Sequence, residues 1–177
     1  MKNSQFIVFI TVVLTIYLIG NLYIFFKGYN VIPPTRLNRT LYIIIFLALA
    51  TTFFTGRILE SIHSSVFADI LNTIGGFWMG FLLYGFLFLL LSDIAGLLLK
   101  ITGIINTQTF PDYRKWSFAI AMMLSALFIA GGFINALIPV VRKYNLTIEK
   151  PADGINNLRI AAVSDIHLGS IIRKRSM

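Results

Sequence analysis

A short run of residues near the carboxyl end of the sequence has types and spacing suited to metal chemistry. Residues 158–169 read LRIAAVSDIHLG, so a compact apolar segment is followed by Asp165, His167 and Gly169. Side chains two positions apart in an extended strand point the same way, so Asp165 and His167 are predicted to converge beyond a strand end. A carboxylate and an imidazole together suit Zn, Mn or Fe, and Gly169 permits a tight turn beside them. The alternative is that Asp165 caps the next segment and His167 is an ordinary surface histidine.

The whole phrase RIAAVSDIHLG resembles the opening motif of the calcineurin-like metallophosphoesterases, in which a buried strand ends in Ser-Asp-x-His-x-Gly. The preceding NLTIEK and DGINNLRI are similar to the strand, turn and first core strand that lead into this motif in membrane-anchored members of the family. The resemblance covers about the last thirty residues. It implies two sheets flanked by helices and two divalent metal ions, Mn, Fe or Zn, with Asp165 and His167 as ligands of the first.

The other motifs of that family do not follow in this sequence. After Gly169 come only the residues SIIRKRSM, without a Gly-Asp motif, a Gly-Asn-His motif or another His. We therefore assign no catalytic and no cofactor-binding residue in this chain. One Asp and one His leave a divalent ion mostly hydrated, so we expect no tightly bound metal and no turnover by this chain alone. We expect an amino-terminal piece in which residues 145–177 begin a truncated α/β metallophosphoesterase domain of two sheets.

The composition of the rest of the chain is typical of an integral membrane protein. The sequence is 57% hydrophobic and only 12% charged, and its apolar residues come in blocks of membrane-spanning length. These blocks predict a mainly α fold, a bundle of four transmembrane helices within residues 1–144, with spans at about 6–26, 38–56, 73–93 and 116–141. The net charge of +8 comes largely from basic clusters beside the blocks. Such clusters favour lipid head groups as partners, and we expect no nucleic acid.

Prolines and polar segments predict how the spans are connected. Pro33 and Pro34 break any helix and leave a short basic loop. Residues 57–72 have apolar positions on one face, which predicts an amphipathic connector lying at the membrane interface. Pro111 is predicted to lie in a polar loop after the third span and to end its helix.

Three polar residues near the third span are interpreted without a functional role. Asp69 and Asp93 are predicted just outside a span of ordinary length, so neither carboxylate needs to be buried. The alternative is that Asp93 lies in lipid, where it would need a partner and would suggest an ion pathway. His63 has no second ligand at a suitable spacing and is interpreted as a solvated surface residue.

The distribution of basic residues predicts the orientation in the cell membrane. The first and third loops carry six basic residues, whereas the short segments on the other side carry only Lys2 and Arg57. The six basic residues are Lys27, Arg36, Arg39, Lys100, Arg114 and Lys115. The positive-inside rule places those loops in the cytosol and the carboxy-terminal domain outside it. Arg142 and Lys143 oppose this assignment, although a large domain can cross regardless of charge.

Two functions from different classes follow. The first is a membrane-anchored, metal-dependent phosphoesterase acting on a phosphoester substrate, with a lipid-linked or wall-linked phosphoester as a natural choice. The alternative is a non-enzymatic four-helix membrane scaffold or a small transporter. A transporter is expected to show paired charges within the membrane or broken helices, and the sequence indicates neither.

Overall fold

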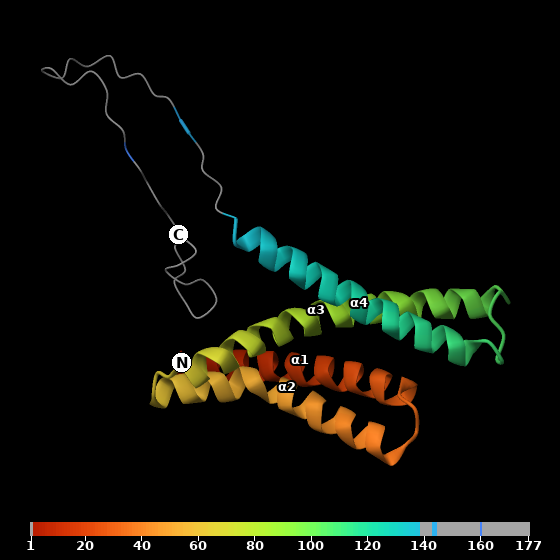
Figure 1. The fold of residues 1–177 in the computed structure, drawn as a ribbon, viewed down its shortest axis with the longest axis horizontal. Coiled ribbons are helices and arrows are strands. Elements are labelled where there is room, and N and C mark those ends of the chain that lie inside the picture. The colour runs from red at the N-terminus through yellow and green to blue at the C-terminus, as the bar shows by residue number, and fades with distance from the viewer. Residues whose placement is uncertain (1, 139–142, 145–159, 161–177) are drawn as a thin grey trace, which may run out of the picture.

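Four long helices make up the fold in the computed structural model, which describes residues 2–138, 143–144 and 160 (Figure 1). They are α1 (Lys2–Val31), α2 (Arg36–Ile62), α3 (Val66–Ile101) and α4 (Phe110–Ala136). Within these ranges the prediction of a mainly α bundle of four helices is confirmed. The described residues contain no strand. The strands predicted after residue 145 lie outside these ranges, except for Ile160, and stay predictions.

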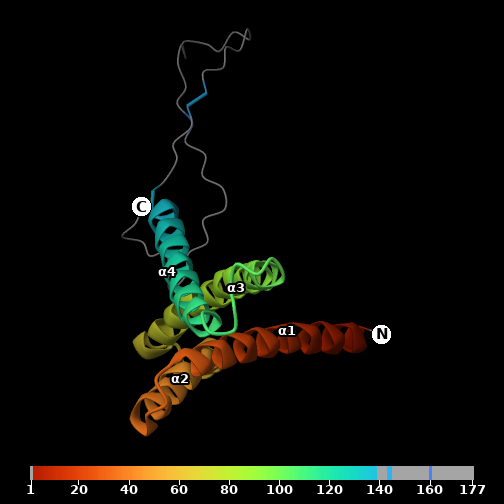
Figure 2. The same cartoon turned by 90° about the vertical axis from the view of Figure 1, so that its right-hand side faces the viewer.

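The central helix is α3, which contacts each of the other three and packs most extensively on α2 and then on α4. The α1–α2 and α3–α4 loops lie at one end of the molecule, and the α2–α3 connection lies at the other (Figure 1). The amino-terminal half of α1 and the carboxyl-terminal half of α4 lie apart (Figure 2). α1 and α4 therefore meet through the carboxyl-terminal half of α1 and the amino-terminal half of α4, whereas α2 and α3 also pack closely near their connection at residues 63–65.

The first two helix boundaries follow the predicted break at the two prolines. α1 ends at Val31, and α2 begins at Arg36 after Pro33 and Pro34. The Thr35 side chain accepts a hydrogen bond of 3.3 Å from the backbone N–H of Asn38, which satisfies one of the free amides of the first turn.

The predicted interfacial connector over residues 57–72 is wrong. α2 continues to Ile62, and α3 already begins at Val66, so only residues 63–65 separate the two helices. Ser65 caps α3 by accepting a hydrogen bond of 3.3 Å from the backbone N–H of Ala68. The apolar positions of this segment therefore belong to the end of α2 and the start of α3. The cap at Ser65 lets a new helix begin directly after the chain reverses at residues 63–65.

The start of α4 also differs from the prediction. Pro111 lies in the first turn of α4, which begins at Phe110, and not in the loop before it. Proline is favoured there because its missing N–H has no intrahelical partner at a helix start and its φ is already helical. α4 ends at Ala136, five residues before the predicted end of the last span at Val141, a residue that lies outside the described ranges.

The packed centre of the bundle is rich in aromatic rings. Trp78 is buried and packs edge-on against Phe46 of α2, with ring centroids 5.1 Å apart, and stacks on Phe81. Ile24 of α1 and Leu89 of α3 are each only 2% exposed and belong to the same core. Trp78 is therefore a packing residue of the bundle core.

Most of the apolar surface of the four helices faces outward. Each helix contains a window of membrane-spanning length and hydropathy, and only 11% to 22% of the residues in these windows are buried inside the bundle. Large side chains such as Phe6 (66% exposed) and Leu91 (60% exposed) therefore lie on the outside. An apolar surface of this extent is stable only against lipid, and the chain is a multi-pass integral membrane protein.

Candidate functional site

The residues predicted to bind metal, Asp165 and His167, lie outside the residues that the structure describes, so their convergence stays a prediction. Within residues 2–138, 143–144 and 160, no group of three or more His, Cys, Asp or Glu side chains is placed to hold a metal ion. His63 is exposed at the end of α2, where its backbone N–H donates to Leu59 O at 2.9 Å. The interpretation of His63 as a surface residue is confirmed.

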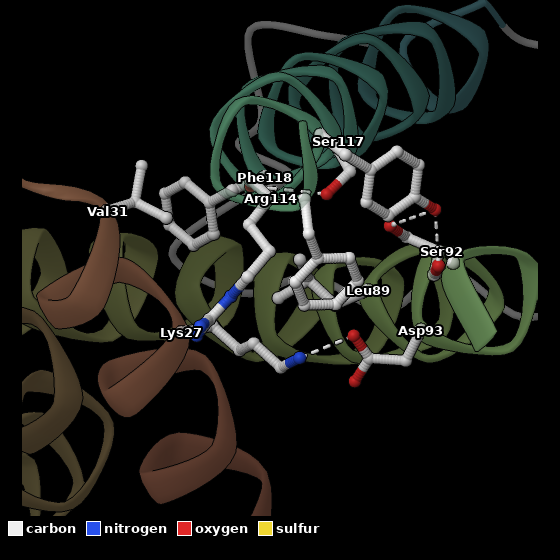
Figure 3. A pocket seen from close by; sticks show the side chains of 11 residues that line it. Lys27, Val31, Leu89, Ser92, Asp93, Arg114, Ser117 and Phe118 are labelled. Carbon is white, nitrogen blue, oxygen red and sulfur yellow. Dashed lines mark hydrogen bonds and ion pairs between the residues drawn. The ribbon is translucent and has the colours of Figure 1, made fainter. Parts of the chain in front are cut away.

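The most prominent polar cluster of the described residues joins α1 to α3. The Lys27 ammonium forms an ion pair with Oδ1 of Asp93, and the Tyr23 hydroxyl donates a hydrogen bond of 2.6 Å to Oδ2. The Lys27 Nζ also lies 5.5 Å from the centre of the Tyr23 ring. Both carboxylate oxygens of Asp93 are therefore engaged by α1, and Figure 3 shows the contact with Lys27.

Local helix geometry explains why one carboxylate can accept both partners. Tyr23 and Lys27 are four residues apart, so they lie one turn above each other on the same face of α1. The pair with Asp93 is partly exposed, with 27% of the Lys27 side chain and 43% of the Asp93 side chain accessible. A partner of this kind reduces the cost of a carboxylate near the hydrocarbon region.

Asp93 lies within α3, and its predicted place just outside the membrane-spanning part of this helix stays a prediction. α3 continues for eight residues beyond Asp93, to Ile101, because the apolar segment 94–101 sustains the helix without a break. At 36 residues, α3 is about 54 Å long, which exceeds a hydrocarbon core of about 30 Å. Centred on such a core, the helix places Asp93 about 12 Å from its end, at the boundary between head groups and hydrocarbon.

A cleft of about 50 Å³ lies beside this cluster, between the carboxyl-terminal part of α1, the second half of α3 and the start of α4. Its polar side chains come from three helices: Lys27, Ser92, Asp93, Tyr113, Arg114 and Ser117. In Figure 3 the Arg114 side chain extends from α4 towards α1, and Lys27 reaches across to Asp93. Cations from two helices thus line the same small space.

Close packing holds α4 against α3 at this cleft. The Tyr113 hydroxyl donates a hydrogen bond of 2.6 Å to the carbonyl oxygen of Ser92. A Cβ atom on Gly96 would lie 2.6 Å from Cε1 of Tyr113, so only glycine leaves room for the ring. This contact fixes the first turns of α4, and with them Arg114 and Ser117, relative to α3.

A second polar network lies deeper, in the core of the bundle. The indole N–H of Trp78 donates to Oδ1 of Asn21 at 3.1 Å, and Nδ2 of Asn21 donates to the carbonyl oxygen of Tyr17 at 2.8 Å. The Tyr17 hydroxyl donates to the carbonyl oxygen of Ala50 at 2.6 Å, which connects α1 to α2. These hydrogen bonds tie α1, α2 and α3 together in the core of the bundle.

Sequence reasoning missed the pairing of Lys27 with Asp93 and the cleft beside it. It expected no paired charges within the membrane, whereas the structure forms such a pair at the edge of the spans. The one available signal was that a carboxylate in a long apolar helix needs a partner. No local pattern identifies Lys27 as that partner, because the two residues lie 66 positions apart.

Comparison with known protein families, curated proteins and solved structures finds no match to this chain. The arrangement of the described residues therefore carries the functional argument, together with the sequence motif after Tyr144. The described site brings Lys27, Asp93 and Arg114 to one small cleft.

Proposed function

We propose that the four helices are a non-enzymatic membrane scaffold that holds the segment after Tyr144 at the bilayer surface. The observation that carries this proposal is the set of four unbroken helices of membrane-spanning length, packed around an apolar core with its polar groups paired. Lipid is the partner that this surface requires. A scaffold needs stable helix packing and no internal reaction site. The described residues provide the stable helix packing.

A small transporter is less well supported by the same arrangement. The pair of Lys27 and Asp93 is one feature expected of an ion pathway, but it lies at one end of the bundle and is partly exposed. None of the four described helices is interrupted, whereas transporter sites are typically built from discontinuous helices near the middle of the membrane. The cleft beside the pair is small, and its lining residues all come from that end.

A second, more specific function is favoured by the sequence motif. In this proposal the scaffold anchors a metal-dependent phosphoesterase, and residues 145–177 are the beginning of its catalytic domain, facing a lipid-linked or wall-linked phosphoester. The support is the resemblance of RIAAVSDIHLG to the opening motif of the calcineurin-like metallophosphoesterases. Asp165 and His167 have the donor atoms for a first metal.

The donor set of this chain does not by itself fit a resident metal centre. The motif supplies one carboxylate and one imidazole, and structural or catalytic sites need three or four protein ligands. The described residues add no cluster to complete the set. The phosphoesterase proposal therefore concerns a domain to which this chain contributes one motif, and we assign no reaction step to the residues in hand.

The scaffold proposal is tested by extraction. The chain is expected to stay with the membrane after washing with high salt and with alkaline carbonate, and to dissolve only in detergent, because its attachment is apolar. Release by either wash would contradict four spans.

The phosphoesterase proposal is tested on the histidines, of which the chain has two. Added Mn²⁺ is expected to broaden the NMR signals of the His167 ring selectively, even when binding is weak, and to leave those of His63 sharp. Asp165→Asn is expected to remove this selectivity, while Asp112→Asn, a matched change on exposed α4 surface, leaves it intact. Equal broadening of both histidines would count against the motif as a ligand pair.

The coding sequence after Met177 provides an independent test. A continuation with Gly-Asp and Gly-Asn-His motifs is expected if the second function is right, and unrelated sequence there would leave only the scaffold. In a form of the protein that carries those motifs, Asp165→Asn is expected to abolish metal-dependent hydrolysis of an aryl phosphodiester without affecting membrane insertion.

A further inference from the structure

The cleft between α1, α3 and α4 lies at the level where phospholipid head groups are found. Lys27 is four residues from the end of α1, and Arg114 is four residues from the start of α4, so each lies about 6 Å from a helix end. When helices of 27 to 36 residues are centred on a core of about 30 Å, both positions fall near its boundary, as Asp93 does. The cleft therefore opens where lipid phosphates lie.

The charges of the cleft are unbalanced in favour of an anion. Asp93 neutralises Lys27, but the Arg114 guanidinium has no ion-pair partner among the described residues, although it lines the same cleft. The neighbouring Lys115 is different, because it lies 3.9 Å from Asp112 and does not line the cleft. Of the two cations that line the cleft, Arg114 is therefore the one without an ion-pair partner among the described residues.

The surroundings of Arg114 suit a single phosphate group. A guanidinium presents planar paired donors that match two phosphate oxygens, and Lys27 adds a point charge from the opposite wall. The volume of about 50 Å³ corresponds to about three or four water molecules, enough for one phosphate and too little for an acyl chain. The wall also contains Leu89, Phe110 and Phe118, against which the glycerol end of a lipid can pack.

We propose that this cleft binds the phosphate of an anionic phospholipid head group, with Arg114 as the main donor and Lys27 shared between the phosphate and Asp93. The acyl chains then continue down the exposed apolar faces of the helices, which a free phosphate ion cannot use. The end of the bundle that holds the cleft carries six basic and two acidic residues, so it also favours a lipid with net negative charge over a zwitterionic one. The proposal is independent of any phosphoesterase domain.

The test uses the purified chain in neutral detergent micelles, with the dissociation constants of short-chain lipids measured by native mass spectrometry. Phosphatidylglycerol is the anionic lipid, phosphatidylcholine carries the same phosphate without net charge, and glycerol phosphate is the soluble head group. We expect phosphatidylglycerol to bind about tenfold more tightly than the other two. Arg114→Gln is expected to weaken its binding about tenfold, the size expected for a hydrogen-bonded charge.

Two further variants separate a defined site from diffuse surface charge. Lys115→Gln removes the same charge one residue away and is expected to change the affinity less than twofold. Asp93→Asn frees Lys27 and is expected to tighten phosphatidylglycerol binding severalfold. Lys115→Gln and Arg114→Gln change exposed side chains, so unchanged helix content and thermal unfolding are expected for both. Asp93→Asn breaks the pair with Lys27, so it is expected to keep its helix content and to unfold at a slightly lower temperature.

Three results would overturn the inference. Equal losses with Arg114→Gln and Lys115→Gln would mean that general surface charge attracts the lipid. Weaker binding with Asp93→Asn would show that Lys27 does not face the ligand. If glycerol phosphate binds as tightly as phosphatidylglycerol, with the same dependence on Arg114, the ligand is a free phosphoester and the lipid assignment is wrong.

Discussion

Substituting Gly75 by alanine is expected to separate the two helices that make the most extensive contact in the bundle, α2 and α3. Gly75 is buried where α3 crosses α2, and a Cβ atom there would lie 2.5 Å from Cα and 2.7 Å from the backbone nitrogen of Phe53. Both neighbours are backbone atoms, so no side-chain rotation can relieve the contact. Gly56 of α2 has a similar contact, 2.8 Å from the backbone nitrogen of Asn72.

The expected magnitude follows from the displacement. Ordinary contacts begin at about 3.4 Å, so α2 and α3 must move apart by roughly 1 Å at Gly75→Ala. Overpacking of this size typically costs about 1–3 kcal/mol. Alanine also favours the helix over glycine by up to about 1 kcal/mol, which works in the opposite direction. A matched control is therefore needed to isolate the contact.

Gly131→Ala in α4 is that control, because nothing lies within 4 Å of a Cβ at this position. It carries the same gain in helix propensity without the clash. The free energy of unfolding of both variants can be measured by titrating the protein in mild detergent with dodecyl sulfate. The fluorescence of Trp78 is a suitable signal, because this residue is buried in α3 three positions after Gly75.

We expect Gly75→Ala to be less stable than Gly131→Ala by about 1–3 kcal/mol, with Gly131→Ala equal to or slightly more stable than the original protein. Gly56→Ala is expected to follow Gly75→Ala. Equal stability of Gly75→Ala and Gly131→Ala would refute the close approach of α2 and α3 at this point.

Three other predictions concern the polar contacts and the orientation. Trp78→Phe leaves Oδ1 of Asn21 without its donor. It is expected to destabilise the protein by about 1 kcal/mol in the same titration, in line with hydrogen bonds measured in membranes. No change in stability would mean that another donor replaces the indole. Lys27→Met is expected to lower the free energy of unfolding by about 1 kcal/mol, because the pair with Asp93 is partly exposed. Adding Asp93→Asn to this variant is expected to recover most of that loss. Additive losses of the two substitutions would contradict the pairing. A reporter that is active only outside the cytosol, fused after Lys150, is expected to be active, and activity of a cytosol-only reporter at this position would reverse the orientation.

The number of helices could be predicted because membrane insertion depends on properties that a sequence displays directly. An apolar block long enough to cross the hydrocarbon core must satisfy its backbone hydrogen bonds internally, and a helix does so from residues four apart. The break at Pro33 and Pro34 is equally local, since proline removes a donor and clashes with the preceding turn. For these features no distant contact needs to be known.

Helix boundaries were less predictable because they depend on single caps and on what the helix meets at the interface. Residues 57–72 have the amphipathic pattern of an interfacial helix, yet Ser65 supplies a cap that divides them between α2 and α3. Pro111 is compatible with both a loop and a first helical turn, and the sequence around it does not choose between them.

The sequence by itself determined that the chain lies in a membrane and roughly where it crosses, and it predicts, outside the described residues, a metal-binding motif at Asp165 and His167. Only the tertiary structure decided that Asp93 pairs with Lys27, that Asn21 meets Trp78, and that Arg114 lines a cleft without an ion-pair partner among the described residues. The physical reason is the range of the interactions. Helix formation and insertion depend on neighbours within a few residues, whereas these contacts join residues 57 or more positions apart and arise only when the helices pack.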